Sequence, residues 1–148
     1  MLAPAQRQAV MALASVARIL ECSLGELTLP QFRVLALVEA YPERAGRLAA
    51  VAGVSRPSLT GVLDGLVTRG WVRRSDVDGD RRGVRLEITA EGRRALDGAT
   101  FGAAGQLGEL AAHLEADDRR ALRQGFAALS RAIDAHRRER ATLAEVRR

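Results

Sequence analysis

The stretch SRPSLTGVLDGLVTRGWVRR, residues 55–74, changes its periodicity partway along and thereby decides the fold. Ser55 is a strong N-cap, Pro57 is tolerated in a first helical turn, and Gly70 ends the run. The apolar residues between them recur at the spacing of one helix face: Leu59, Val62, Leu63, Leu66 and Val67. The sequence therefore predicts an amphipathic helix over 55–69.

After Gly70 the apolar residues alternate with polar ones, which is the period of a half-buried strand. Residues 71–74 begin one strand, residues 78–83 (DGDRRG) form the turn, and residues 84–88 (VRLEI) form the second strand. A hairpin with one apolar face is expected directly behind the helix.

Three helices are predicted before this unit. Residues 4–24 carry an apolar stripe, and Thr28-Leu29-Pro30-Gln31 is a capping box that opens a helix over about 29–41, ending near Pro42. A short helix over roughly 45–52 turns Leu48, Val51 and Ala52 inward and ends at Gly53. A helix, a glycine turn and a capped helix form a helix-turn-helix, and the hairpin behind it makes a winged helix.

Two further helices follow the hairpin. Thr89 caps a long helix, Asp117 and Asp118 suit the first turn of the last one, and residues 137–148 form a polar tail expected to fray. The predicted fold is mainly α with a small β-hairpin wing, in one domain, residues 1–148. A winged helix-turn-helix lobe covers 28–95, and helical dimerisation regions cover 1–27 and 96–148.

The dimer is inferred from unpartnered apolar stripes. Val10, Leu13, Leu129 and Ile133 belong to stripes on the first and last helices, and one chain of 148 residues offers them few partners. A second copy would cover them. The alternative is that the two terminal helices pack on each other within one chain.

Composition limits the class of protein. The chain carries a net charge of +5, and all 23 basic residues are arginine, which offers a planar fork of donors for phosphates and guanine edges. A GC-rich coding bias also explains the lack of lysine. Because Cys22 is the only cysteine and no long apolar run or signal peptide occurs, we expect a cytoplasmic protein without membrane contact.

The hairpin tip has two interpretations. Residues 69–85 hold six arginines against three aspartates, whereas a merely solvated turn needs only turn formers such as Asp-Gly. Asp80 is placed to orient a neighbouring guanidinium for insertion into a narrow minor groove. Because the hairpin follows a helix-turn-helix, we favour DNA contact over a solvated tip.

The exposed face of the predicted recognition helix has few donors. Arg56 alone can make a bidentate guanine contact, whereas Ser58 and Thr60 can form hydrogen bonds with phosphates or base edges. Pro57 can touch a thymine methyl, and Gly61 permits close approach of the backbone. A carboxylate here is repelled by phosphates. Asp64 is therefore either paired with Arg74 or Arg82, or an exposed residue with no fixed partner.

The segments LTLPQFRVLALV (27–38), LAAVAGVSRPSLTGVLDGLVTRGWVRR (48–74) and DGDRRGVRLEITAEG (78–92) resemble the MarR family of bacterial transcription regulators. The similarity runs without gaps through about 28–95. It implies a homodimer on a pseudo-palindromic operator, in most cases a repressor released by a small ligand or an oxidant. The usual ligand cavity of the family lies between the dimerisation helices and the DNA-binding lobe, and the effector here is unidentified.

The resemblance also implies residue roles. Ser55, Arg56, Ser58 and Thr60 would approach the major groove, and Arg82, steadied by Asp80, would enter the minor groove beside Arg81. Arg74 would support the wing or contact a phosphate. The chain departs from the family at Gly61, where many members carry a larger polar or basic residue. The expected DNA-binding set is Ser55, Arg56, Pro57, Ser58, Thr60, Gly61, Arg74, Asp80, Arg81 and Arg82.

Other functions are disfavoured. His113 and His136 are expected at the surface, and no metal-ligand spacing, phosphate loop or nucleophile motif occurs, so we expect no enzyme, metal or cofactor. Some relatives sense peroxides through a cysteine near the start of the first helix. Cys22 lies late in that helix and is expected to be a buried structural thiol. A winged-helix protein that coats DNA with low sequence specificity is the remaining alternative.

Overall fold

The computed structural model describes residues 3–41, 48–49, 52, 54–77 and 80–146, and it places their side chains except those of 76–84, 141 and 144–146. Its elements follow the predicted order of helices, hairpin and helices. They are α1 (Pro4–Ser23), α2 (Leu29–Ala40), α4 (Arg56–Thr68), β1 (Val72–Val77), β2 (Asp80–Ile88), α5 (Ala90–Ala112) and α6 (Ala116–Val146).

Three of these helices begin at the capping residues that the sequence indicates: Thr28, Ser55 and Thr89. The Thr28 hydroxyl accepts a hydrogen bond from the Gln31 N–H at 3.3 Å, while the Gln31 side chain accepts one from the Thr28 N–H at 3.0 Å. The Thr89 hydroxyl accepts a hydrogen bond from the Gly92 N–H at 3.0 Å. Each cap satisfies donors that a helix start otherwise leaves unpaired.

The short helix expected over 45–52 is described only in part. Leu48, Ala49 and Ala52 are helical, and Leu48 and Ala49 are buried in the core. The inward position of Val51, the glycine end at Gly53 and the helix stop at Pro42 lie outside the described residues.

The core lies inside the winged-helix lobe. Leucines from four elements meet there: Leu35 of α2, Leu66 of α4 and Leu86 of β2 have no exposed surface, and Leu96 of α5 is 4% exposed. Leu59 and Leu63 complete the buried face of α4 at 3% each, as the helical spacing predicts. Burial of this kind stabilises a side chain by roughly 1.5–3 kcal/mol relative to an exposed position. The outer face of α4 is therefore held in a fixed orientation.

The hairpin differs from its prediction. Strand β2 begins at Asp80, so Asp80–Gly83 belong to the strand and not to the turn. Asp76 pairs with Val84 and Val77 pairs with Asp80, so the register passes over residues 81–83. An irregularity of this kind bends and twists a ladder without ending it, and alternation alone does not reveal it.

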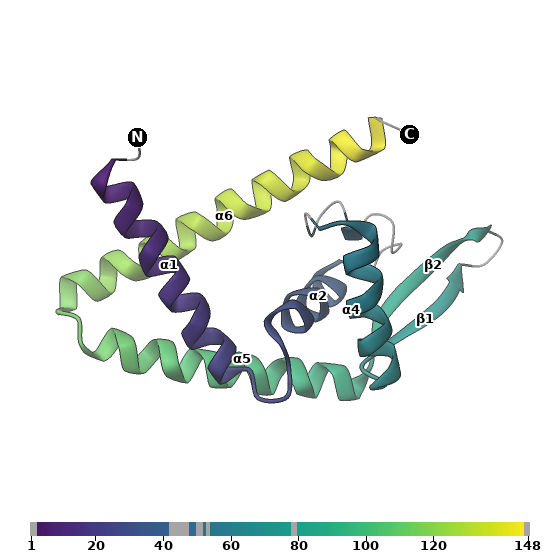
Figure 1. Ribbon diagram of the computed structural model, residues 1–148, viewed down its shortest axis with the longest axis horizontal. Coiled ribbons are helices and arrows are strands. Elements are labelled where there is room, and N and C mark those ends of the chain that lie inside the picture. Colours follow the sequence, from purple (N-terminus) through teal and green to yellow (C-terminus); the bar gives the residue numbers. More distant parts are fainter. Residues whose placement is uncertain (1–2, 42–47, 50–51, 53, 78–79, 147–148) are drawn as a thin grey trace.

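Helix α5 connects the lobe to the terminal helices (Figure 1). Helix α5 starts beneath the hairpin, runs along the base of the molecule and leads into α6, which turns back. Helix α1 packs against α5. The tail expected to fray from residue 137 is instead helical through Val146, and residues 147 and 148 lie outside the described residues. The last part of α6 holds good helix formers without Gly or Pro, and Asp134 pairs with Arg137 at 3.5 Å.

The terminal stripes remain uncovered in the single chain. Leu13 of α1 is 55% exposed and Leu129 of α6 is 44% exposed, so the two helices do not cover each other's stripes. The alternative of mutual packing within one chain is wrong. Through the described ranges, no helix combines the length and the hydropathy needed to span a membrane.

Candidate nucleic-acid interface

The residues expected to contact DNA at the start of α4 share one exposed end of that helix. The Ser55 hydroxyl caps the helix by accepting a hydrogen bond from the Ser58 N–H at 3.3 Å, and the two serine Oγ atoms lie 2.8 Å apart. The Thr60 hydroxyl donates to the Arg56 carbonyl at 2.9 Å, which leaves its lone pairs as acceptors. All members are exposed: Ser55, Arg56, Pro57, Ser58, Thr60 and Gly61.

Gly61 leaves open space on this face. A Cβ built there meets no heavy atom within 4 Å, so nothing inside the subunit requires a glycine. A backbone or base could approach closely at this point.

Asp64 is paired with Arg74 of strand β1. Arg74 Nη2 donates to Asp64 Oδ1 at 2.6 Å, and the side chains are 44% and 56% exposed respectively. This settles the two interpretations of Asp64 in favour of the ion pair with Arg74. Exposed pairs contribute roughly 0–1 kcal/mol to stability, so this one adds little to the fold but brings the Arg74 guanidinium of the wing against α4.

A second group of charges lies on the hairpin ladder. Arg73 Nε donates to Glu87 Oε2 at 2.7 Å, and Arg85 Nε lies 3.9 Å from Glu87 Oε1. The single negative charge of Glu87 thus offsets one of the two positive charges. These two side chains are less suited to a phosphate contact than an arginine without such a carboxylate.

Asp80, Arg81 and Arg82 open strand β2, in the part of the hairpin where the register is irregular. The expected steadying of Arg82 by Asp80 concerns side chains outside the described part of the structure.

The base of the hairpin is attached closely to α5. The Thr89 hydroxyl donates to the Gly70 carbonyl at 2.7 Å, and the Thr89 N–H donates to the Trp71 carbonyl at 3.0 Å. A Cβ at Gly92 would lie 2.1 Å from the Trp71 carbonyl oxygen, so only glycine fits there. Gly70 itself has φ +72°, which also favours glycine.

Arg69 is a functional candidate that the sequence did not single out. It follows α4, donates to the Glu26 carbonyl at 3.4 Å, lies 3.7 Å from the Glu26 carboxylate and stacks 4.7 Å above the Trp71 ring. It therefore links the end of α4 to the connection between α1 and α2. Because 43 residues separate Arg69 from Glu26, no local pattern could reveal this contact.

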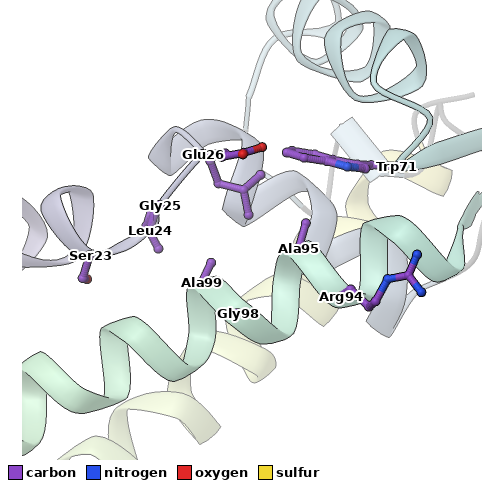
Figure 2. Close-up of a pocket in the computed structure, with 10 residues that line it drawn as sticks. Ser23, Leu24, Gly25, Glu26, Trp71, Arg94, Ala95, Gly98 and Ala99 are labelled. Carbon is purple, nitrogen blue, oxygen red and sulfur yellow. The ribbon is translucent and has the colours of Figure 1, made fainter.

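A pocket of about 230 Å³ lies beside this link, where the α1–α2 connection, Trp71 and α5 meet. Figure 2 shows Glu26 and Trp71 on one side, and Arg94, Ala95 and Ala99 of α5 on the other. The lining combines an aromatic ring, small apolar groups and two opposite charges. Such a lining suits a small, partly apolar molecule with a polar group.

The remaining candidate side chains give a mixed outcome. His113 and His136 are exposed as expected. Cys22 is also exposed, so the expectation of a buried thiol is wrong for the single chain. The physical reason is that α1 contacts its neighbours over a narrow face and buries none of its residues fully.

Comparisons with known proteins agree with this architecture. The MarR family model matches residues 25–83. The uncharacterized HTH-type transcriptional regulator YfiV of Bacillus subtilis (strain 168) is 28% identical over 115 residues, which cover 77% of this chain and 72% of YfiV.

Solved structures extend the similarity over most of the chain. Wild-type MarR from E. coli, in its apo form, has a TM-score of 0.74 and 27% identity, covering 87% of this chain and 98% of that one. The transcriptional repressor CouR, bound to a 23-mer DNA duplex, has a TM-score of 0.71 and 30% identity, and the match covers 83% of this chain and 89% of that one. The matched region and the shared fold show that this chain belongs to the MarR family of transcription regulators.

Proposed function

We propose that this protein is a sequence-specific DNA-binding repressor that acts as a homodimer and responds to a small molecule. The observation that carries the proposal is the ion pair between Asp64 and Arg74, 2.6 Å long, which joins strand β1 of the arginine-rich wing to α4. Two DNA-contacting elements are thereby fixed relative to each other, as simultaneous contact with two grooves requires.

The DNA-binding lobe, residues 28–95, would place the N-terminal turn of α4 in the major groove. Arg56 would supply the base contact, and Ser55, Pro57, Ser58, Thr60 and Gly61 would line the approach. In the wing, Arg82 would enter the minor groove with Asp80 orienting it, and Arg81 and Arg74 would contact phosphates. CouR, a repressor with the same fold, is bound to a DNA duplex, which supports this arrangement.

The homodimer would be built by residues 1–27 and 96–148. Large apolar side chains stay exposed along all three helices of these regions, among them Met11 at 61%, Phe101 at 83% and Leu143 at 61%. A two-fold dimer would carry two lobes and would bind half-sites about 34–36 Å apart or a multiple of that distance. This geometry leads us to expect a pseudo-palindromic operator.

The response to an effector would originate in the pocket at Trp71. A bound molecule there would contact the α1–α2 connection, the start of the wing and α5 together. Because Arg69 bridges Glu26 and Trp71, occupancy would shift the end of α4 relative to α5. A repressor would lose affinity for its operator if the shifted state fitted DNA less well.

Selection of genomic fragments by the purified protein, followed by affinity measurements on the recovered sequence and on scrambled duplex, tests the proposal. A specific regulator should prefer its operator by roughly 10³-fold or more, with affinity falling steeply as salt rises. A preference below about tenfold would instead support the protein that coats DNA with low specificity. No binding to any duplex at low salt would refute both.

A further inference from the structure

Glu26 and Trp71 together already hold one positive charge of the chain itself. The Arg69 guanidinium lies 4.7 Å from the centroid of the Trp71 ring, and its Nη1 lies 3.7 Å from Oε2 of Glu26. An aromatic face attracts a cation through its quadrupole, and a carboxylate attracts it through its charge. An aromatic face beside a carboxylate is therefore suited to bind an organic cation.

The same two residues line the pocket of about 230 Å³, whereas Arg69 is not part of its lining. Figure 2 shows the Trp71 ring edge-on above Ala95, with the Glu26 carboxylate beside the ring and directed toward it. The pocket thus presents the ring and the carboxylate from a side that Arg69 leaves open. A second cation could reach both groups from within the pocket.

The charges around the pocket favour a cation over an anion. Arg94 is the positively charged residue of the lining, and its Nη2 donates to Glu91 Oε1 at 2.8 Å, so a carboxylate at hydrogen-bond distance already offsets its charge. The contact of Glu26 with Arg69, at 3.7 Å, is longer than a hydrogen bond, and the Glu26 side chain is 84% exposed. The Glu26 carboxylate is therefore the charge of the lining that a ligand can satisfy more easily.

The floor of the pocket limits the size of a ligand. Ala95, Gly98 and Ala99 lie three and four residues apart on one face of α5, and all three line the pocket. A Cβ at Gly98 would meet nothing within 4 Å, so the missing side chain leaves the floor open. Sites for drug-sized ligands occupy roughly 300–1,000 Å³, which exceeds the volume here. The occupant should therefore be no larger than one flat ring with a single charged group.

We infer that this pocket binds a small organic cation, an amidinium, guanidinium or ammonium group on a single flat ring, which competes with Arg69 for Glu26 and Trp71. The inference rests on the proposed function, because it names the chemical class of the effector proposed for this pocket. Two positive charges would then share one carboxylate and one ring, so each weakens the binding of the other. Ligand binding would loosen the contact of Arg69 with the α1–α2 connection and thereby free the end of α4.

The fluorescence of Trp71, the only tryptophan of the chain, reports occupancy of the pocket directly. Benzamidinium and benzoate have nearly the same shape and opposite charge, so a titration of the wild type with each compares the two signs. Benzamidinium should change the emission saturably and bind about tenfold more tightly than benzoate, because Glu26 attracts the first and repels the second. Benzoate binding as tightly as benzamidinium, or no saturable change with benzamidinium, would overturn the inference without any variant.

Three variants test the competition with Arg69. Glu26→Gln keeps the size of the side chain and removes its charge, and it should weaken benzamidinium binding by about tenfold. The matched control is Glu21→Gln near the end of α1, which makes the same change outside the pocket and should bind like the wild type. Arg69→Gln removes the competing cation and should strengthen binding by about threefold or more. A merely structural role of Arg69 would give the opposite sign, and weaker or unchanged binding in this variant, with helicity intact, would contradict the competition.

Operator affinity separates this inference from the proposed function. Saturating benzamidinium should weaken operator binding of the wild type by about tenfold, a coupling of ordinary size, whereas Arg69→Gln should bind the ligand and lose this response. If benzoate and not benzamidinium releases the operator, the cation inference is wrong and the proposed function stands. If the wild type binds no duplex at low salt, the proposed function fails, and the Trp71 titration still decides whether the pocket binds a cation.

Discussion

At the scale of single residues, we expect two arginines, Arg56 and Arg82, to decide what the lobe recognises. Arg56 stands at the start of α4 beside the Ser55 cap, and Arg82 belongs to the irregular start of β2. A guanidinium reads guanine edges or inserts into a minor groove according to where the backbone presents it. These two positions therefore lead to different expectations for the same substitution.

Replacing Arg82 with alanine should weaken operator binding about tenfold or more. It should also reduce the slope of log affinity against log salt concentration by roughly one, because one phosphate contact and its released counterion are lost. Fluorescence anisotropy at several salt concentrations measures both. Arg140→Ala, on the far end of α6, serves as the control with the same charge change. An unchanged affinity for the Arg82 variant would remove the wing from the mechanism.

Replacing Arg56 with alanine should relax the base preference at one position of each half-site, a loss of roughly 1–3 kcal/mol of discrimination. Selection from a randomised duplex pool shows this as a flattened position in the recovered sequences. Arg56→Lys keeps the charge and should retain affinity while losing part of the preference. A sharp, unaltered preference in the alanine variant would contradict the major-groove role.

At the scale of elements, the contacts between α4, the hairpin and α5 determine how the lobe stays together. Asp64 joins α4 to β1, and the backbone of Trp71 touches Gly92 of α5. The first contact is exposed and electrostatic, whereas the second is a close backbone approach. Their loss should therefore affect different properties.

Asp64→Ala should change stability by less than about 1 kcal/mol, because the pair is exposed. It should nevertheless lower the ratio of specific to nonspecific affinity. The free Arg74 would bind any phosphate, and the repulsion from the carboxylate would be gone, while the wing would lose its fixed position. Titrations with operator and scrambled duplex determine the ratio, and an undiminished ratio would show that the ion pair does not position the wing.

Gly92→Ala should destabilise the fold by roughly 1–3 kcal/mol or more, because the new Cβ would overlap the Trp71 carbonyl and displace the backbone. Gly98→Ala in the same helix has open space and should stabilise by about 0.5–1 kcal/mol. Urea unfolding compares the two variants. Equal stabilities would mean that the hairpin base and α5 are not tightly packed.

The same elements show what the sequence can and cannot reveal. Thr28, Ser55 and Thr89 cap helices through neighbours three residues away, and Leu59, Leu63 and Leu66 repeat at helical spacing, so local patterns identified them. The sequence alone did not decide whether Asp64 pairs with Arg74, with Arg82 or with no fixed partner, because the choice depends on how the hairpin folds over α4. The Arg69 contact with Glu26 is entirely long-range. The strand start at Asp80 was missed because alternation does not continue through an irregular register.

At the scale of the whole molecule, the fold separates a compact lobe from helices with uncovered apolar faces. The core cluster lies mostly in the lobe, whereas α1 and α6 have no fully buried side chain among their described residues. We expect such helices to gain stability from the proposed second copy of the chain. Cys22 is exposed for the same reason, because the single chain buries no residue of α1 fully. The sequence alone did not reveal this, since it does not say which face of α1 the single chain covers.

The unfolding temperature should therefore rise with protein concentration, because association stabilises the folded state by mass action. Differential scanning calorimetry over a hundredfold concentration range would show an upward shift. Phe101→Ala should flatten this dependence and lower the midpoint at low concentration. A midpoint independent of concentration in the wild type would argue against a dimer coupled to folding.

The close contact between Gly92 and Trp71 has a geometric consequence for the proposed response to an effector. Helix α5 has 23 residues and is about 35 Å long, and its first turn moves together with the wing. A tilt of about 5° at the far end would therefore carry the wing tip sideways by roughly 3 Å, the full length of a hydrogen bond. Tilts of α5 too small to disturb the core would therefore suffice to change the spacing of the two lobes of the proposed dimer, so that they no longer match the DNA grooves.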